Sequence, residues 1–267
     1  MIAVAALVVL GYLFGAFVTI DTNLLWFRSV QHESVYTRTF WTQVLLFALF
    51  GSLMAAAVGL SLIAVYRNRP AFTPDPIRQR WRWRYLRLEP RVRTWVFVIV
   101  VAYLTITMGS RAAGSWQTWL LWRHAVHVGG PGDPQFHRDA SYYMFVYPMH
   151  RMVLTYAFRI VATSLVVFLI AAYLYGGLRL RGTGPRMTNA VRTQLSVILG
   201  GYLVLKAFAY WLDRYALVTS NRGVVTGVGY TDAHAVLPGR IVLMVIALVA
   251  AALLFANAFL QRPRLMS

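Results

Sequence analysis

Six stretches of apolar residues, separated by polar segments rich in arginine, dominate the pattern of this sequence. A helix that crosses the hydrocarbon core of a bilayer takes about 20 mostly apolar residues and satisfies its own backbone amides there. We therefore predict an all-α fold, a polytopic transmembrane helical bundle of about six spans that forms one domain over residues 1–267. The predicted spans are residues 2–20, 42–66, 95–108, 153–175, 195–212 and 241–260.

The first stretch could also be the apolar core of a cleaved signal peptide. It lacks a basic start, and residues 21–26 that follow it do not form a small-residue cleavage site. We therefore interpret it as a retained helix.

Composition supports a membrane protein. Hydrophobic residues make up 59% of the chain and charged residues only 13%, whereas soluble domains carry about 25% charged residues. The chain contains no cysteine, which excludes disulfides, iron–sulfur clusters and thiolate chemistry.

The net charge of +18 is distributed unevenly between the predicted connections. Fifteen arginines fall in the loop 67–93, in the segment 179–192 and near the C-terminus, and nine fall in the loops 21–41, 111–151 and 213–240. Because cytoplasmic loops collect Lys and Arg, we expect both termini to be cytoplasmic in a bacterial inner membrane and the second set of loops to lie outside. The same rule explains the basic charge without nucleic-acid binding.

Basic and aromatic residues interleave in the first cytoplasmic loop. We expect an interfacial helix here, with tryptophans in the headgroup layer and arginines on the phosphates of anionic membrane lipids. A docking site for an acidic cytoplasmic partner is the alternative. The candidate contacts are Arg78, Arg80, Trp81, Arg82, Trp83 and Arg84.

The long outer loop contains three tryptophans at helical spacing, Trp116, Trp119 and Trp122. They predict an amphipathic helix at the outer interface that contacts lipid headgroups or a partner. His124 and His127 follow, but no third ligand has suitable spacing, so we predict no metal site. No predicted span contains a histidine that could hold haem, and we predict no cofactor.

Two charged residues, Arg159 and Lys206, fall inside predicted spans. Such residues are costly in a bilayer and mark candidate functional sites. Asp213 follows Lys206 by two helical turns on the same face, and Arg214 is next to it. We favour structural ion pairs or snorkelling side chains, with a proton or ion pathway as the alternative. No span contains a carboxylate, and no catalytic motif is present.

Several stretches resemble a known bacterial family. They are residues 25–27 with 36–38, residues 133–136 with 142–145, residues 205–215, and residues 227–232 with 235–238. Together they resemble uncharacterised protein family 0182, whose members are large multi-spanning membrane proteins. The resemblance implies a helical membrane region followed by a further span and a large extracytoplasmic domain, whereas this sequence ends at Ser267. It implies no activity and no catalytic residues.

These features lead us to expect a non-enzymatic membrane protein, an anchor or an accessory subunit that packs against other membrane-protein subunits. A transporter or channel with Lys206, Arg159 and Asp213 near the pathway is the first alternative. An envelope enzyme acting on lipid-linked substrates at the outer face is the second.

Overall fold

The computed structural model describes residues 2–70, 84–85, 87–178, 187–220 and 227–260. In these residues the chain is helical apart from the connections between helices, among them the long loop at residues 124–139, and one isolated bridge between Leu178 and Met187. The predicted all-α bundle is confirmed. The α-helices are α1 (Ile2–Ser29), α2 (Glu33–Arg67), α4 (Pro90–Ala113), α5 (Trp116–Arg123), α6 (Tyr147–Leu174), α7 (Asn189–Asp213) and α8 (Leu237–Leu260).

Five helical segments are long and apolar enough to cross a membrane. They are Glu33–Arg67, Pro90–Ala113, Tyr142–Leu174, Asn189–Asp213 and Asp232–Leu260. The first predicted span lies within α1, which has 28 residues. The number of six spans therefore stays a prediction, although each predicted span corresponds to a helix.

The helices extend further than the apolar stretches that predicted them. Residues 21–41, which we expected to form an outer loop, are helical except for a turn at residues 30–32. Arg28 and Glu33 pair across this turn at 3.0 Å, and Gln31 has a positive φ of 58°. The loop prediction was wrong because hydropathy marks only the lipid-facing part of a helix, whereas backbone hydrogen bonds continue beyond it.

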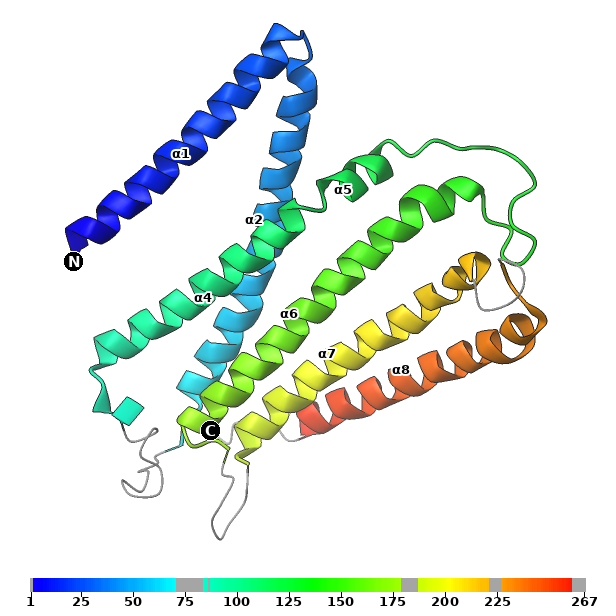
Figure 1. Ribbon diagram of the computed structural model, residues 1–267. Coiled ribbons are helices and arrows are strands. Elements are labelled where there is room, and N and C mark those ends of the chain that lie inside the picture. Colours follow the sequence, from blue (N-terminus) through cyan, green and yellow to red (C-terminus); the bar gives the residue numbers. More distant parts are fainter. Residues whose placement is uncertain (1, 71–83, 86, 179–186, 221–226, 261–267) are drawn as a thin grey trace.

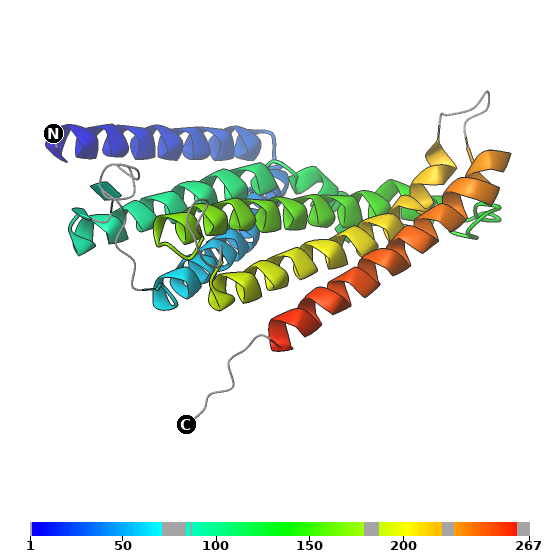
Figure 2. The same ribbon diagram turned by 90° about the horizontal axis from the view of Figure 1, so that it is seen from below.

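The spans run in alternating directions, so the bundle has two distinct ends (Figures 1 and 2). One end holds the last turns of α2, α6 and α8 and the first turns of α4 and α7, with Arg67, Arg69, Arg84, Arg91 and Arg93 among its described residues; we call it the arginine-rich end. The other carries the α1–α2 turn, α5, and the connections from α5 to α6 and from α7 to α8. We call it the aromatic end. Helix α1 reaches out from the aromatic end and stands apart from the other helices (Figure 1).

The core forms along one face of α2. Buried side chains recur at every third or fourth residue of this helix, which places them on one stripe. That stripe packs against α4 and α6, with α7 and α8 continuing the row. The buried apolar residues of α2 are Leu46, Phe50, Met54, Val58, Leu62 and Val65.

Small residues allow two pairs of helices to approach closely. A Cβ atom at Gly109 of α4 would lie 2.7 Å from Cδ2 of Phe47 on α2. A Cβ atom at Gly200 of α7 would lie 3.0 Å from the ring of Phe255 on α8. Close packing of this kind associates helices in lipid, where the hydrophobic effect between them is lost.

Two spans begin with a π-helical turn. Residues Tyr142–Val146 precede α6, and Asp232–Val236 precede α8. In both cases a proline, Pro148 or Pro238, follows two residues later. The proline ring would clash with the carbonyl group four residues earlier in a regular α-helix. The wider π turn accommodates the proline without ending the span.

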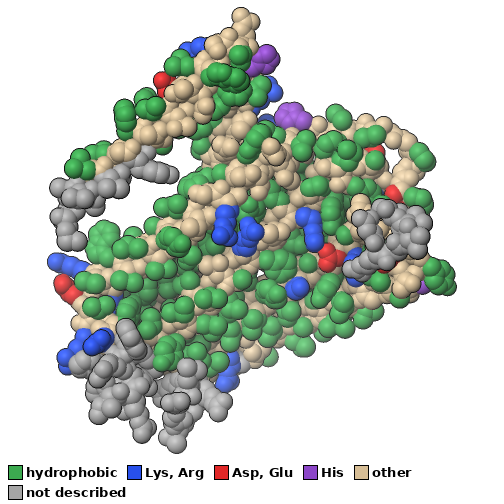
Figure 3. Space-filling model, in the orientation of Figure 1, with side chains coloured by type: hydrophobic (Ala, Val, Ile, Leu, Met, Phe, Trp, Pro, Cys, Tyr) green, Lys and Arg blue, Asp and Glu red, His purple; other side chains and the backbone are tan. Residues whose placement is uncertain are grey.

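Large apolar side chains cover much of the outer surface (Figure 3). On α8, for example, Leu253 and Phe259 are each 66% exposed. A surface this apolar suits lipid or another membrane helix rather than water. Only a few basic and acidic side chains interrupt it on the face in view (Figure 3).

Candidate functional site

Lys206 lies half-buried on α7 among aromatic rings. Its Nζ atom is 5.9 Å from the centroid of the Phe158 ring and 5.6 Å from that of Tyr210. In the described part of the chain no carboxylate forms an ion pair with it. The ion pair between Lys206 and Asp213 that the sequence spacing suggested is not formed. The negative potential of the two ring faces stabilises the ammonium group of Lys206 instead.

Asp213, the last residue of α7, pairs with a residue of the neighbouring helix α6. Its Oδ1 atom accepts a hydrogen bond from Nη1 of Arg151 at 2.6 Å. The backbone carbonyl of Asp213 also accepts a hydrogen bond from Arg240 in the first turn of α8. The carboxylate and carbonyl of one residue thus join the ends of α6, α7 and α8.

Arg159 is exposed on α6, and its guanidinium carbon lies 5.3 Å from the centroid of the Tyr156 ring. Tyr156 is itself buried, and its hydroxyl donates to the backbone carbonyl of Arg111 at 2.6 Å. No ion pair to Arg159 forms within the described residues. An arginine deep in a span and facing outward needs water or another protein surface beside it.

Arg214 belongs to an aromatic cluster where α7 ends. Its guanidinium carbon is 5.8 Å from the Trp211 ring centroid and 5.7 Å from that of Tyr215. Tyr215 also packs against Phe136 and Tyr142 from the long loop and the start of the fourth span. These half-buried rings of the loop thus pack against the end of α7.

Two carboxylates shape the long loop between α5 and α6. Asp133 accepts hydrogen bonds from the backbone amides of Gln135 and Phe136 and from the hydroxyl of Tyr143. Burial raises the pKa of Asp133, but these donors outweigh it and leave the pKa below its usual value. Asp139 accepts from Nδ1 of His127 at 3.0 Å, and this bond contributes most to a pKa lowered to about 2.

Hydrogen bonds of this kind hold the shape of the long loop. His127 points its ring at Asp139, whereas Nδ1 of His124 donates to the carbonyl of Leu120 at 2.9 Å. Among the described residues, no group of three or more potential metal ligands occurs.

The three loop tryptophans lie on α5, the short helix that the sequence predicted. Trp116 and Trp119 are half-buried and pack against the core, whereas Trp122 is 39% exposed. Two of the three proposed headgroup contacts therefore also anchor α5 to the bundle.

Most of the basic loop that we proposed as a lipid contact, residues 78–83, lies outside the described residues. Arg84 is described and is exposed in a helical segment. The adjacent Tyr85 places its hydroxyl 3.3 Å from that of Tyr175, at the end of α6. Nearby, a largely apolar groove of about 660 Å³ lies between α2 and α4, with Arg91 and Arg93 among its lining residues.

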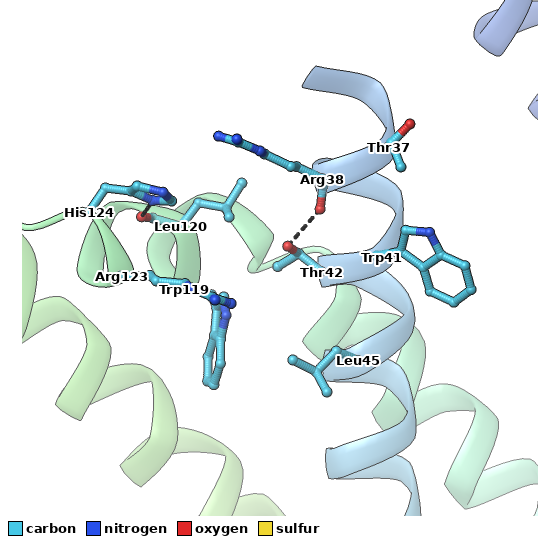
Figure 4. Close-up of a pocket in the computed structure, with 9 residues that line it drawn as sticks. All are labelled: Thr37, Arg38, Trp41, Thr42, Leu45, Trp119, Leu120, Arg123 and His124. Carbon is cyan, nitrogen blue, oxygen red and sulfur yellow. Dashed lines mark hydrogen bonds between the residues drawn. The ribbon is translucent and has the colours of Figure 1, made fainter. Parts of the chain in front are cut away.

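A pocket of about 440 Å³ lies between α2 and α5 at the aromatic end (Figure 4). Arg38 extends from α2 toward α5, where Leu120 and His124 lie, while the indole of Trp41 points away. The pocket is lined by Thr37, Arg38, Trp41, Thr42, Leu45, Trp119, Leu120, Arg123 and His124. Sequence reasoning missed Arg38 and Arg123 as a site, because they come from segments far apart in the chain.

The whole chain matches one known family. A sequence model of the Uncharacterised protein family (UPF0182) matches residues 1–267. The chain belongs to the UPF0182 family. No solved structure matches it.

Three relatives show how much of a UPF0182 protein this chain covers. UPF0182 proteins of Frankia casuarinae, Thermobifida fusca and Streptomyces coelicolor are 41%, 40% and 39% identical to it. The aligned regions cover 91%, 98% and 96% of this chain, but only 24%, 25% and 26% of those proteins. The chain thus spans about a quarter of the length of the UPF0182 relatives that it matches.

The stretches that carry the UPF0182 resemblance gather at one end of the bundle. Residues 25–27 and 36–38 flank the α1–α2 turn, residues 133–145 form the long loop and the first π turn, and residues 205–215 end α7. Residues 227–238 precede and begin α8. These stretches therefore share the aromatic end with the pocket and the Asp213 contacts, although the family model matches the whole chain.

Proposed function

We propose that this UPF0182 chain is a non-enzymatic anchor or accessory subunit of a bacterial cytoplasmic membrane complex. In this proposal both termini face the cytoplasm, and the aromatic end lies at the outer surface. The concentration of arginine in the connections at the other end supports that orientation, because positive loops resist translocation.

The observation that carries the proposal is the isolation of α1. None of its described side chains is buried, and its visible contacts are with α2 near the turn, where Phe27 stacks on Tyr36 at 5.4 Å. Phe14 and Phe17 are 69% and 64% exposed on the rest of the helix. A helix that leaves its bundle in this way is placed to pack against a helix of another subunit.

The sequence of α1 also suits close helix packing. Gly11 and Gly15 are four residues apart, and a Cβ atom at either would meet nothing within 4 Å. Thr19 continues the same face, and its hydroxyl donates to the carbonyl of Gly15. Small residues at this spacing allow two membrane helices to approach until their backbones touch.

The absence of cysteine allows a clean test by single-cysteine cross-linking. Phe14→Cys on α1 and Leu253→Cys on α8 would each carry a photoreactive maleimide in membranes of the native host. The two side chains have similar exposures of 69% and 66%. We expect a discrete adduct with a second membrane protein from position 14 and none from position 253.

The small-residue face supplies the control for that experiment. The double substitution of Gly11→Leu and Gly15→Leu on α1 should abolish the adduct. Gly201→Leu should leave it unchanged, because Gly201 lies on α7, where a Cβ atom also meets nothing within 4 Å. Adducts from both cysteine positions would indicate random collisions and contradict the proposal. An adduct of twice the mass of the chain would also contradict it, because it would indicate self-association.

A transporter or channel is the second candidate, favoured by the half-buried Lys206 that lacks a carboxylate partner among the described residues. Such a protein would carry water past this position. Lys206→Cys should then react with a small charged thiol reagent added to either side of sealed vesicles. In the anchor proposal this position stays unreactive, since it is packed between Phe158 and Tyr210.

A further inference from the structure

We infer that the pocket between α2 and α5 binds the phosphate group of an anionic amphiphile, most simply a phospholipid of the outer leaflet. The inference concerns a site separate from the α1 surface and does not depend on the anchor role proposed above; only the choice of the outer leaflet rests on the orientation proposed there. It rests on the charge of the pocket, on its apolar floor and on its place in the bundle.

Two guanidinium groups line this pocket, and no carboxylate among the described residues neutralises them. Arg38 comes from the second turn of α2 and Arg123 from the end of α5. No acidic residue lines the pocket, and no ion pair to either arginine forms within the described residues. Glu33, the acid one turn before Arg38, is engaged by Arg28 through two hydrogen bonds of 3.0 and 3.2 Å.

Several other arginines at this end have partners among the described residues. Arg151 is paired with Asp213, and Arg214 lies over the rings of Trp211 and Tyr215. Two arginines in one pocket repel each other, and an anion bound to both offsets this repulsion because each guanidinium group attracts it. A phosphate suits guanidinium groups because it can accept paired, charge-assisted hydrogen bonds from them.

His124 adds a third nitrogen donor beside the arginines. Its Nδ1 atom is engaged by the carbonyl of Leu120, so Nε2 is the ring atom that can meet a ligand. Figure 4 shows the imidazole on α5 across from the guanidinium of Arg38. A tetrahedral phosphate could therefore receive donors from both helices.

The floor of the pocket is apolar, which favours a lipid over a free anion. Leu45 and Trp119 line it on the side toward the middle of the bundle, and Thr42 there is buried, with its hydroxyl bonded to the carbonyl of Arg38. A second, mostly apolar pocket of about 490 Å³ adjoins it and shares Leu120 and His124. A headgroup at the arginines would thus have two apolar surfaces for its acyl chains.

The site lies at the depth that such a ligand requires. Arg38 and Arg123 are near the ends of their helices, while Leu45 is two turns further into the span. Trp119 contacts Trp122 with ring centroids 5.4 Å apart, and tryptophan prefers the headgroup level of a membrane. Charged donors above and apolar walls below match a phospholipid from phosphate to upper acyl chain.

The test compares lipid binding by the intact purified chain and by charge variants, using native mass spectrometry in mild detergent. The probes are dihexanoyl-phosphatidylglycerol, dihexanoyl-phosphatidylcholine and inorganic phosphate. We expect retention of phosphatidylglycerol over phosphatidylcholine, and a loss of roughly tenfold or more in its affinity for Arg38→Gln with Arg123→Gln. The control, Arg138→Gln with Arg214→Gln, removes equal charge from the same end outside the pocket and leaves the pair of Arg28 with Glu33 intact.

The source of the phosphate is distinguished by a change in the floor. Leu45→Trp should block the acyl chains and weaken phosphatidylglycerol binding while it leaves both arginines in place; Leu45 is 48% exposed, so the larger ring can be accommodated. A soluble phosphate compound would be identified by a different pattern. Inorganic phosphate would then bind through the arginines, Leu45→Trp would leave that binding unchanged, and acyl chains would add no affinity. Equal losses in the two charge variants, or no preference between the two lipids, would overturn the inference. Circular dichroism checks that each variant is folded.

Discussion

Asp213 shows how much one side chain decides at the aromatic end. Its two oxygen-bearing groups join three helices through Arg151 and Arg240. The Asp213 side chain is 31% exposed and that of Arg151 is 44% exposed, so solvent screens the pair in part. The contribution of the pair should therefore be modest but larger than that of a fully exposed pair.

Replacing Asp213 with Asn tests this contribution. We expect Asp213→Asn to lower the free energy of unfolding by about 1 kcal/mol, because Arg151 loses its counter-charge. Thermal unfolding in detergent measures the change. Glu33→Gln, which breaks the more exposed pair with Arg28, should cost clearly less, and equal effects would contradict this ranking.

The contact between Asp139 and His127 gives the long loop a defined response to acid. The pKa of Asp139 is lowered to about 2, below its usual value near 4. A carboxylate with a depressed pKa stabilises the folded loop above pH 4, and this stabilisation is lost as the pH falls from about 4 to about 2. Asp139→Asn should remove that dependence.

Hydrogen exchange of the loop amides at pH 5 and pH 3 measures this effect. The loop of the parent chain should become less protected at pH 3, after correction for intrinsic exchange rates. The loop of Asp139→Asn should show the same corrected protection at both values. An identical pH response in the two proteins would show that another group controls the loop.

At the scale of the helices, small residues set how closely neighbours pack. Gly200 and Gly201 are adjacent on α7 but face different surroundings, since a Cβ atom at Gly200 meets the Phe255 ring at 3.0 Å and one at Gly201 meets nothing within 4 Å. The hydropathy of the span does not distinguish them. Only the position of α8 does.

These two glycines form a matched pair for mutation. Gly200→Leu should lower the free energy of unfolding by about 2 kcal/mol, because the new side chain pushes α8 away. Gly201→Leu should be neutral or slightly stabilising, because leucine favours the helix by up to about 1 kcal/mol over glycine. Unfolding of both variants by heat compares them, and equal destabilisation would refute the assigned α7–α8 contact.

At the scale of the whole molecule, the separation of the two ends is the dominant feature. Alternating helices bring connections that are far apart in the sequence to the same end (Figure 1). The proposed orientation then makes a simple prediction about access from outside the cell. A reagent outside the cell should reach a cysteine at the α1–α2 turn, but it should not reach a cysteine directly after α2.

Single-cysteine labelling in intact cells tests this orientation. Val30→Cys lies in the turn at the aromatic end, and Asn68→Cys caps α2 at the arginine-rich end. A membrane-impermeant maleimide should label the first only, and both should react after the cells are opened. Labelling of Asn68→Cys alone in intact cells would reverse the proposed topology.

The sequence by itself determined the helical class, the presence of a helix at each predicted span and the difference in charge between the two sets of connections. These are local properties, since hydropathy and arginine content can be counted along the chain. It also placed Trp119 correctly on a short helix. It could not extend α2 back to Glu33, because hydropathy does not register interfacial helix turns.

Only the tertiary structure decided which residues meet. In the structure Asp213 forms its ion pair with Arg151 rather than with Lys206. Helix α1 stands apart from the bundle, and Arg38 and Arg123 line one pocket. The physical reason is that these contacts join separate helices, whose rotation and spacing depend on packing across the whole bundle. A pattern read along one helix cannot contain that information.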